Sequence, residues 1–131
     1  MRSKSLHVAV GVIQKGREVL IARRQKGQHL EGFWEFPGGK LEAGEDAQVA
    51  LARELKEELS IAVIDSHFLF DVTYDYPEKR VTLSIFLVNT FTGEPVGVEG
   101  QPLSWCDIDK LQSYTFPPAN QAIIQYLLKS P

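Results

Sequence analysis

One stretch near the middle of the chain, residues 46–59, constrains the fold more than any other. Asp46 is a typical N-cap residue, and the apolar side chains that follow it recur at helical spacing, so a helix ending near Leu59 is predicted. The side chains expected to face a core are Leu51, Ala52, Leu55 and Leu59. A helix with one apolar side has to pack against another layer of the protein.

The same helix carries three carboxylates on a neighbouring face. Glu54, Glu57 and Glu58 occupy positions i, i+3 and i+4, and at roughly 100° per residue they span a sector about 100° wide. Like charges at this spacing cost a helix on the order of 0.2–0.5 kcal/mol per pair. Converging carboxylate oxygens are the ligands that a hard cation such as Mg²⁺ prefers. A solvated acidic face is the alternative, but the turn-forming pair Gly38-Gly39 just ahead of the helix favours a metal site.

Composition limits the class of protein. The 131 residues favour one domain, which we expect to span residues 1–131. A hydrophobic content of 44% and a charged content of 24% are ordinary for a globular protein. The net charge of −3 disfavours binding to a nucleic-acid polymer, although not to a single nucleotide.

Cysteine usage and the apolar runs indicate a location. The single cysteine, Cys106, excludes an internal disulfide and fits a reducing compartment. The apolar run Leu6–Ile13 is too short for a membrane span and lacks a cleavage pattern after it. We therefore expect a cytoplasmic protein without a membrane partner, and we expect a monomer.

The rest of the chain is predicted to form strands joined by turns, with a second helix at the end. The expected strands are Leu6–Ile13, Glu18–Arg24, two long runs over 61–74 and 80–91, and a short one at Leu103–Cys106. Alternating apolar residues in the run 80–91 indicate a central strand, and Pro117-Pro118 open the final helix. These elements predict an α/β (α+β) fold, a mixed β-sheet sandwiched between helices.

Residues 39–61 resemble the Nudix box, G-x5-E-x7-R-E-U-x-E-E-x-G-U with U an apolar residue. The matching positions are Gly39, Glu45, Arg53, Glu54, Leu55, Glu57, Glu58 and Ile61. One position departs, because Ser60 stands where the box has its last glycine. Since that position ends the helix, where glycine is favoured for its left-handed conformation, we expect modest backbone strain or a slightly altered cap there, without loss of the chemistry. The resemblance implies the Nudix fold.

The resemblance extends beyond the box to the MutT subgroup. The similar segments are Ile21–Arg24, Glu35–Lys40, Glu99–Pro102 and Phe116–Asn120. MutT-like enzymes hydrolyse oxidised purine nucleoside triphosphates such as 8-oxo-dGTP to the monophosphate and pyrophosphate, which removes a source of replication errors from the nucleotide pool. The resemblance therefore implies an enzyme, a nucleoside triphosphate pyrophosphohydrolase.

The resemblance also implies a metal and catalytic set. Its metal ligands are Glu54, Glu57, Glu58, Glu99 and the carbonyl of Gly38, with Mg²⁺ as the cation and Mn²⁺ as an alternative. Arg53 would orient the carboxylates through charge-assisted hydrogen bonds. Glu54 and Glu99 are both candidates for the general base. Glu45 is either part of this set or a carboxylate favoured by the helix dipole.

For the nucleotide, the residues implied are Arg24, His29, Phe36, Gly38, Lys40, Lys79, Ala119 and Asn120. An amide such as that of Asn120 presents a donor and an acceptor together, which can read both O6 and the N7–H that only the 8-oxo base carries. The alternative is that Asn120 serves only as a residue at the start of the final helix. Lys79 stands where the resemblance implies an arginine. The contact with the nucleotide is expected to differ, because lysine lacks the planar guanidinium group that donates two parallel hydrogen bonds.

Two other functions stay open from the sequence. The same chemistry would act on a pyrimidine or another modified nucleoside triphosphate if the base pocket differs. A nucleotide-sensing module would bind without turnover. Such a module tolerates the loss of metal-binding carboxylates, whereas this chain keeps every carboxylate of the expected set.

Overall fold

The computed structural model describes residues 4–130, and within them it contains seven strands and two α-helices. The strands are β1 (Lys4–Lys15), β2 (Glu18–Arg23), β3 (Trp34–Glu35), β4 (Gly38–Lys40), β5 (Ala62–Tyr76), β6 (Lys79–Thr92) and β7 (Leu103–Asp107). The helices are α1 (Ala47–Leu59), α2 (Gln121–Lys129) and two 3₁₀ helices, η1 (Ile108–Ser113) and η2 (Pro118–Asn120). The domain limits expected at residues 1 and 131 lie outside the described residues.

Strand β1 organises the sheet. It pairs in parallel with β6 along most of its length and antiparallel with β4, and its last two residues form a hairpin with β2. Strand β6 lies between β1 and β5, so its expected central position is confirmed. Strand β2 also pairs antiparallel with β3 and β7. The turn expected at Gly38-Gly39 is wrong, because both residues belong to β4, have no positive φ and pair with β1.

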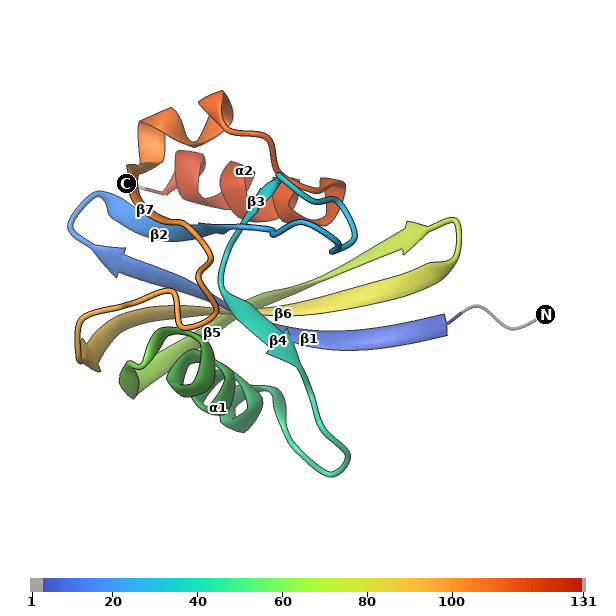
Figure 1. The fold of residues 1–131 in the computed structure, drawn as a ribbon, viewed down its shortest axis with the longest axis horizontal. Helices are drawn as coiled ribbons and strands as arrows, with labels where there is room; N and C mark the ends of the chain where they lie inside the picture. The colour runs from blue at the N-terminus through green and yellow to red at the C-terminus, as the bar shows by residue number, and fades with distance from the viewer. Residues whose placement is uncertain (1–3, 131) are drawn as a thin grey trace.

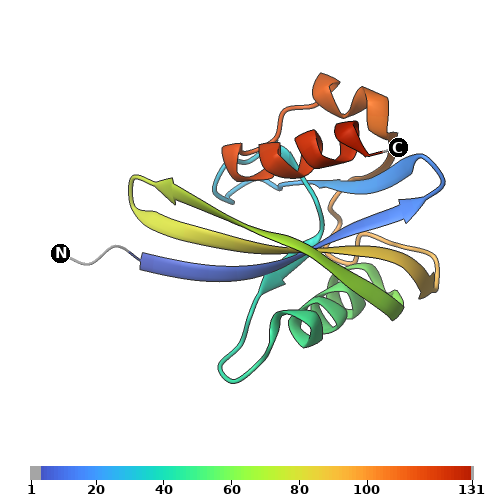
Figure 2. The ribbon, with the colours of Figure 1, turned by 180° about the vertical axis from the view of Figure 1, so that it is seen from behind.

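The two α-helices cover opposite faces of the sheet (Figure 1), and the view from behind shows the same two layers (Figure 2). Alternate residues of β1 supply both cores because successive strand side chains point to opposite faces. Val10 and Val12 pack on the α2 side, whereas Ala9 and Ile13 pack on the α1 side. The predicted mixed sheet between helices is therefore confirmed.

Helix α1 begins as the sequence predicts but buries a different face. The Asp46 carboxylate accepts a hydrogen bond from the Val49 backbone N–H at 2.9 Å, which confirms the N-cap. The three leucines are buried, but Ala52 is exposed and Ala50 is buried in its place. Strand β4 packs against the helix on the side of Glu54, so the buried sector is rotated toward the carboxylates. The acidic face consequently borders another strand and not only solvent.

Ser60 ends α1 in the left-handed conformation, with φ 59° and ψ 32°, as expected for this position. We expect Ser60→Gly to raise the free energy of unfolding by about 0.5–1 kcal/mol, because glycine has no Cβ to strain at positive φ. Ser60→Ala is the matched control, since alanine keeps the Cβ and should bring no gain. Urea unfolding of the three proteins measures the difference. An equal gain from alanine would show that the serine hydroxyl, and not the backbone, limits stability.

Candidate active site

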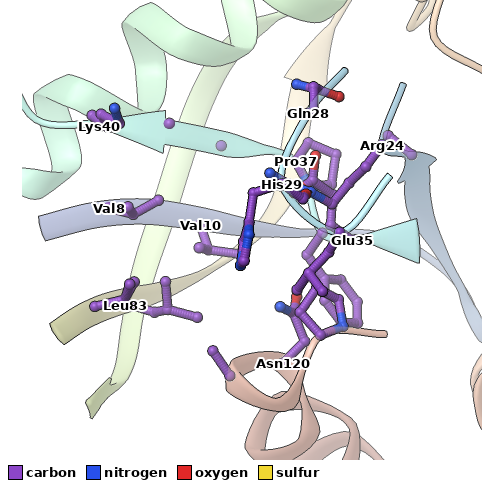
Figure 3. A pocket seen from close by; sticks show the side chains of 18 of the residues that line it. Val8, Val10, Arg24, Gln28, His29, Glu35, Pro37, Lys40, Leu83 and Asn120 are labelled. Carbon is purple, nitrogen blue, oxygen red and sulfur yellow. The ribbon is translucent and has the colours of Figure 1, made fainter. Parts of the chain in front are cut away.

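One cleft of about 340 Å³ brings together segments from most of the chain (Figure 3). Its walls come from β1, β2, the loop after β2, the turn from β3 to β4, the end of α1, the β5–β6 hairpin, residues 99–101 and residues 117–120. All eight predicted nucleotide residues line this cleft: Arg24, His29, Phe36, Gly38, Lys40, Lys79, Ala119 and Asn120. Residues almost 100 positions apart in the sequence therefore share one site.

One end of the cleft is acidic. Glu58, from the last turn of α1, and Glu99, from the loop before β7, both line it. Burial, together with the nearby charges of Glu54, Glu35 and Glu99, raises the pKa of Glu58 to about 8. A divalent cation or a proton would offset the negative charge that Glu58 and Glu99 bring to this end of the cleft.

Gly38 and Gly39 pack too closely against their neighbours to carry a side chain. A Cβ on Gly38 would lie 2.0 Å from the Ala9 carbonyl oxygen of β1, and a Cβ on Gly39 would lie 2.2 Å from the Glu54 Cδ. The first contact is with backbone and the second is with the end of a flexible side chain. These two glycines let β4 pair with β1 and let α1 pack directly over β4.

The two glycines should therefore respond differently to alanine. We expect Gly38→Ala to lower the free energy of unfolding by about 2 kcal/mol, because the β1 backbone has no room to move. Gly39→Ala should cost less than about 1 kcal/mol, because the Glu54 side chain can rotate away. Thermal unfolding of both variants measures this contrast. Equal destabilisation would mean that Glu54 is as rigidly held as the strand.

Arg53 binds the carboxylates beside the cleft. Its guanidinium donates to both carboxylate oxygens of Glu45 at 2.7 and 2.8 Å, to Glu54 at 2.8 Å and to the Lys40 carbonyl at 3.0 Å. Its contact with Glu57 is longer, at 3.4 Å. Hydrogen bonds from Arg53 hold the pKa of Glu45 down at about 2. Glu45 is therefore the partner that fixes Arg53, which is a more specific arrangement than attraction to the helix dipole.

The predicted metal ligands are only partly gathered. Among residues 4–130, no three acidic, histidine or cysteine side chains already form a group that encloses an ion. Glu54 is bound by the Arg53 guanidinium. The Glu57 side chain is 60% exposed and does not line the cleft. Glu58 and Glu99 reach the cleft, where the backbone of Gly38 also lies. The oxygen donors of Glu58, Glu99 and the Gly38 backbone are of the type that suits a divalent cation.

The surroundings of Asn120 distinguish between its two predicted roles, base recognition and a place at the start of the helix. It stands at the N-cap position of α2, but its side chain makes no capping hydrogen bond. The residue is only 8% exposed and lines the cleft, where Figure 3 shows its amide on the wall formed by η2. Its amide is thus available to a ligand, which favours base recognition over helix capping.

Phe36 and Ala119 contribute to the same wall mainly through packing. Phe36 is 3% exposed and stacks on Phe116 with ring centroids 5.4 Å apart. Ala119 is also buried. Because the Phe36 ring is packed in the core, only its backbone remains available to a ligand in the cleft.

Among the cleft residues that the sequence reasoning missed are Glu35 and Tyr76. Glu35 accepts a hydrogen bond from Arg24 Nη1 at 2.5 Å, and the ring of Tyr76 meets that of His29 edge-on at 5.6 Å. Burial raises the pKa of Glu35, and Arg24 partly opposes this. No spacing rule marks Glu35, but its position one residue before the Phe36-Pro37-Gly38 turn was a usable signal.

Comparison with known proteins identifies the family. A sequence model of the NUDIX domain matches residues 8–126. An 8-oxo-dGTP diphosphatase of Escherichia coli K12 is 42% identical over 127 residues, covering 95% of this chain and 97% of the relative. A CTP pyrophosphohydrolase of the same organism is 30% identical over 122 residues, covering 93% and 90%.

A solved structure agrees with these sequence matches. It comes from a study of MutT from Aliivibrio salmonicida and Vibrio cholerae, and it superposes with a TM-score of 0.83 at 36% identity, covering 95% of this chain and 98% of that one. No helix within residues 4–130 is long and apolar enough to cross a membrane. With the box on α1, the cleft beside it and a domain match across residues 8–126, the chain belongs to the Nudix hydrolase family.

Proposed function

We propose that this protein hydrolyses oxidised purine nucleoside triphosphates, converting 8-oxo-dGTP to 8-oxo-dGMP and pyrophosphate. The observation that carries the proposal is the arrangement of one cleft, with the uncommitted amide of Asn120 on one wall and the carboxylates of Glu58 and Glu99 on another. The name of the Escherichia coli relative supports the same substrate. Removal of this nucleotide would keep oxidised guanine out of replication.

The proposed cation is Mg²⁺, with Mn²⁺ as a substitute. Its ligands would be the Gly38 carbonyl and the carboxylates of Glu54, Glu57, Glu58 and Glu99. When bound, the cation neutralises phosphate oxygens and so lowers the barrier to attack on an anionic phosphoryl group. The raised pKa of Glu58 supports this site, because burial and the neighbouring carboxylate charges both disfavour its ionised form and a bound cation would offset both effects.

The chain's own residues position the reactants. Glu45 fixes Arg53, and Arg53 in turn orients the Glu54 carboxylate. Lys40 and Lys79 line the cleft and would contact phosphate oxygens. Glu54 or Glu99 would take the proton from a water whose oxygen attacks the β-phosphorus. The bond from that phosphorus to the oxygen shared with the α-phosphate then breaks, releasing the monophosphate and pyrophosphate.

Asn120 would select the base. Its amide NH₂ donates to O6 and its carbonyl oxygen accepts from N7–H, which ordinary guanine lacks. A buried site built to hydrogen-bond such a group can reject a substrate that lacks the group by roughly 10⁴-fold in favourable cases.

A single-domain, monomeric, cytoplasmic enzyme remains our prediction from the sequence.

The test is pyrophosphate release with Mg²⁺ across a panel of 8-oxo-dGTP, dGTP, dATP, dCTP and CTP. The proposal requires the highest kcat/KM with 8-oxo-dGTP and loss of turnover when EDTA removes the metal. Similar efficiency with dCTP and 8-oxo-dGTP would contradict the substrate. Binding without turnover of any nucleotide would favour a sensing module.

A pyrimidine triphosphate is the second candidate substrate. The 30% identity to a CTP pyrophosphohydrolase over 93% of the chain favours it. The same panel separates the two candidates, because a pyrimidine enzyme would prefer CTP or dCTP over both purines.

A further inference from the structure

The loop after β2 is tied to the cleft by the Arg24 side chain. Its Nε donates to the His29 carbonyl at 2.6 Å, and its Nη1 donates to the Glu35 carboxylate on β3. The Arg24 backbone closes the base of the same loop, since its N–H donates to Phe33 and its carbonyl accepts from Gly32, both at 2.8 Å. One residue thus connects the loop to a rigid strand.

The loop needs such a connection because its backbone is locally unfavourable. Leu30 has φ 57°, a left-handed conformation that costs a non-glycine residue on the order of 1 kcal/mol. Gly27 and Gly32 also have positive φ, and both allow many conformations in the absence of other contacts. Backbone hydrogen bonds from Gln28 to the Gln25 carbonyl at 3.1 Å and from Phe33 to the Leu30 carbonyl at 3.2 Å offset part of this cost. The contacts of Arg24 add an anchor at the base of the loop.

At its other end the loop reaches across the cleft. The His29 ring extends into the cleft (Figure 3) and meets the ring of Tyr76, at the end of β5, at an interplanar angle of 90°. The path from Glu35 through Arg24 and His29 to Tyr76 therefore spans the cleft from β3 to the β5–β6 hairpin. A ligand in the cleft would lie next to this chain of contacts.

We propose that Glu35 is a positioning residue for nucleotide binding: by holding the Arg24 guanidinium it sets the loop of residues 25–32 over the cleft and places His29 against the nucleotide. The proposal rests on the proposed function for its substrate. A loop already in its bound conformation loses less entropy when the ligand binds, so Glu35 strengthens binding. Because Glu35 would act on the nucleotide through Arg24 and the loop, and is not among the predicted metal ligands, its loss should raise KM while leaving kcat nearly unchanged.

The central variant is Glu35→Gln, which keeps the size of the side chain but removes its charge. We expect KM for 8-oxo-dGTP to rise about tenfold and kcat to change less than about threefold. Glu35→Asp keeps the charge and should recover part of the affinity. Glu31→Gln is the matched control, because Glu31 is an exposed carboxylate on the same loop and does not line the cleft.

Limited trypsin digestion reports the loop directly and needs no substrate. Lys26 lies within the loop, so cleavage after Lys26 measures how often the loop opens. We expect the free Glu35→Gln protein to be cut there about tenfold faster than wild type, and Glu31→Gln at the wild-type rate. Thermal unfolding should show that all three proteins remain folded at the digestion temperature.

Two results would overturn the proposal. Unchanged digestion of Glu35→Gln would show that Glu35 does not hold the loop, whatever the substrate is. A fall in kcat with KM unchanged would place Glu35 in the phosphate chemistry instead. Failure of the substrate proposal is distinguishable, because it would alter the nucleotide panel without affecting the digestion rates.

Discussion

Replacing Glu57 with glutamine is expected to lower turnover of a nucleoside triphosphate by roughly 10³-fold or more, because the cation loses a charged ligand and the phosphates lose its neutralisation. The fold should persist, since the Glu57 side chain is 60% exposed and its contact with Arg53 is a weak one at 3.4 Å. Kinetics and calorimetric titration with Mg²⁺ or Mn²⁺ measure the two effects. Both turnover and metal affinity should fall in this variant.

Glu42 offers a closely matched control for Glu57. Its side chain is 69% exposed and approaches the same guanidinium at 3.3 Å, so the two carboxylates have similar surroundings in the free protein. Glu42→Gln should keep turnover within about threefold of wild type, because surface ion pairs contribute little. Near-normal activity in Glu57→Gln, or equal losses in both variants, would contradict the metal assignment of Glu57.

Replacing Asn120 with alanine should reduce the preference for 8-oxo-dGTP over dGTP by roughly ten- to a hundredfold, because two hydrogen bonds to the base are lost. The effect should appear in the ratio of the two kcat/KM values and not in turnover at saturation. Asn120→Asp should retain part of the preference, since a carboxylate still accepts from N7–H but cannot donate to O6.

The control for Asn120 is the adjacent residue of α2. Gln121 is exposed at the start of the helix, and Gln121→Ala should leave both the preference and the stability unchanged. If Asn120→Ala keeps the wild-type preference, the base is read by another part of the cleft. Loss of stability in Asn120→Ala would indicate a structural role, although no capping hydrogen bond would be lost.

Much of the fold could be predicted because its signals are local. The Asp46 cap, the end of α1 at Ser60 and the alternation along β6 depend on residues within a few positions of each other. Errors arose where a neighbouring element decided the outcome. Ala52 is exposed and Ala50 buried because β4 packs against α1 on the side of Glu54, which helical spacing does not reveal.

The candidate site was predictable in membership but not in arrangement. The box and its flanking segments identify the residues, and all eight nucleotide positions do line one cleft. Their partners were not predictable: Arg24 binds Glu35 and the His29 carbonyl in the free protein. Such pairings depend on how β2, β3 and the following loop pack, and many arrangements satisfy the same sequence pattern.

By itself, the sequence determined that a capped helix with an acidic face begins after Asp46 and ends near Leu59, because charge, capping and periodicity act within one segment. Only the tertiary structure decided that Glu58 and Glu99 share a cleft while Glu57 stays outside it, and that Asn120 leaves its helix uncapped. The physical reason is that electrostatic repulsion and burial depend on distances between segments, here α1, the loop before β7 and η2. The acidic helix is one wall of the cleft, and its partners come from the far end of the chain.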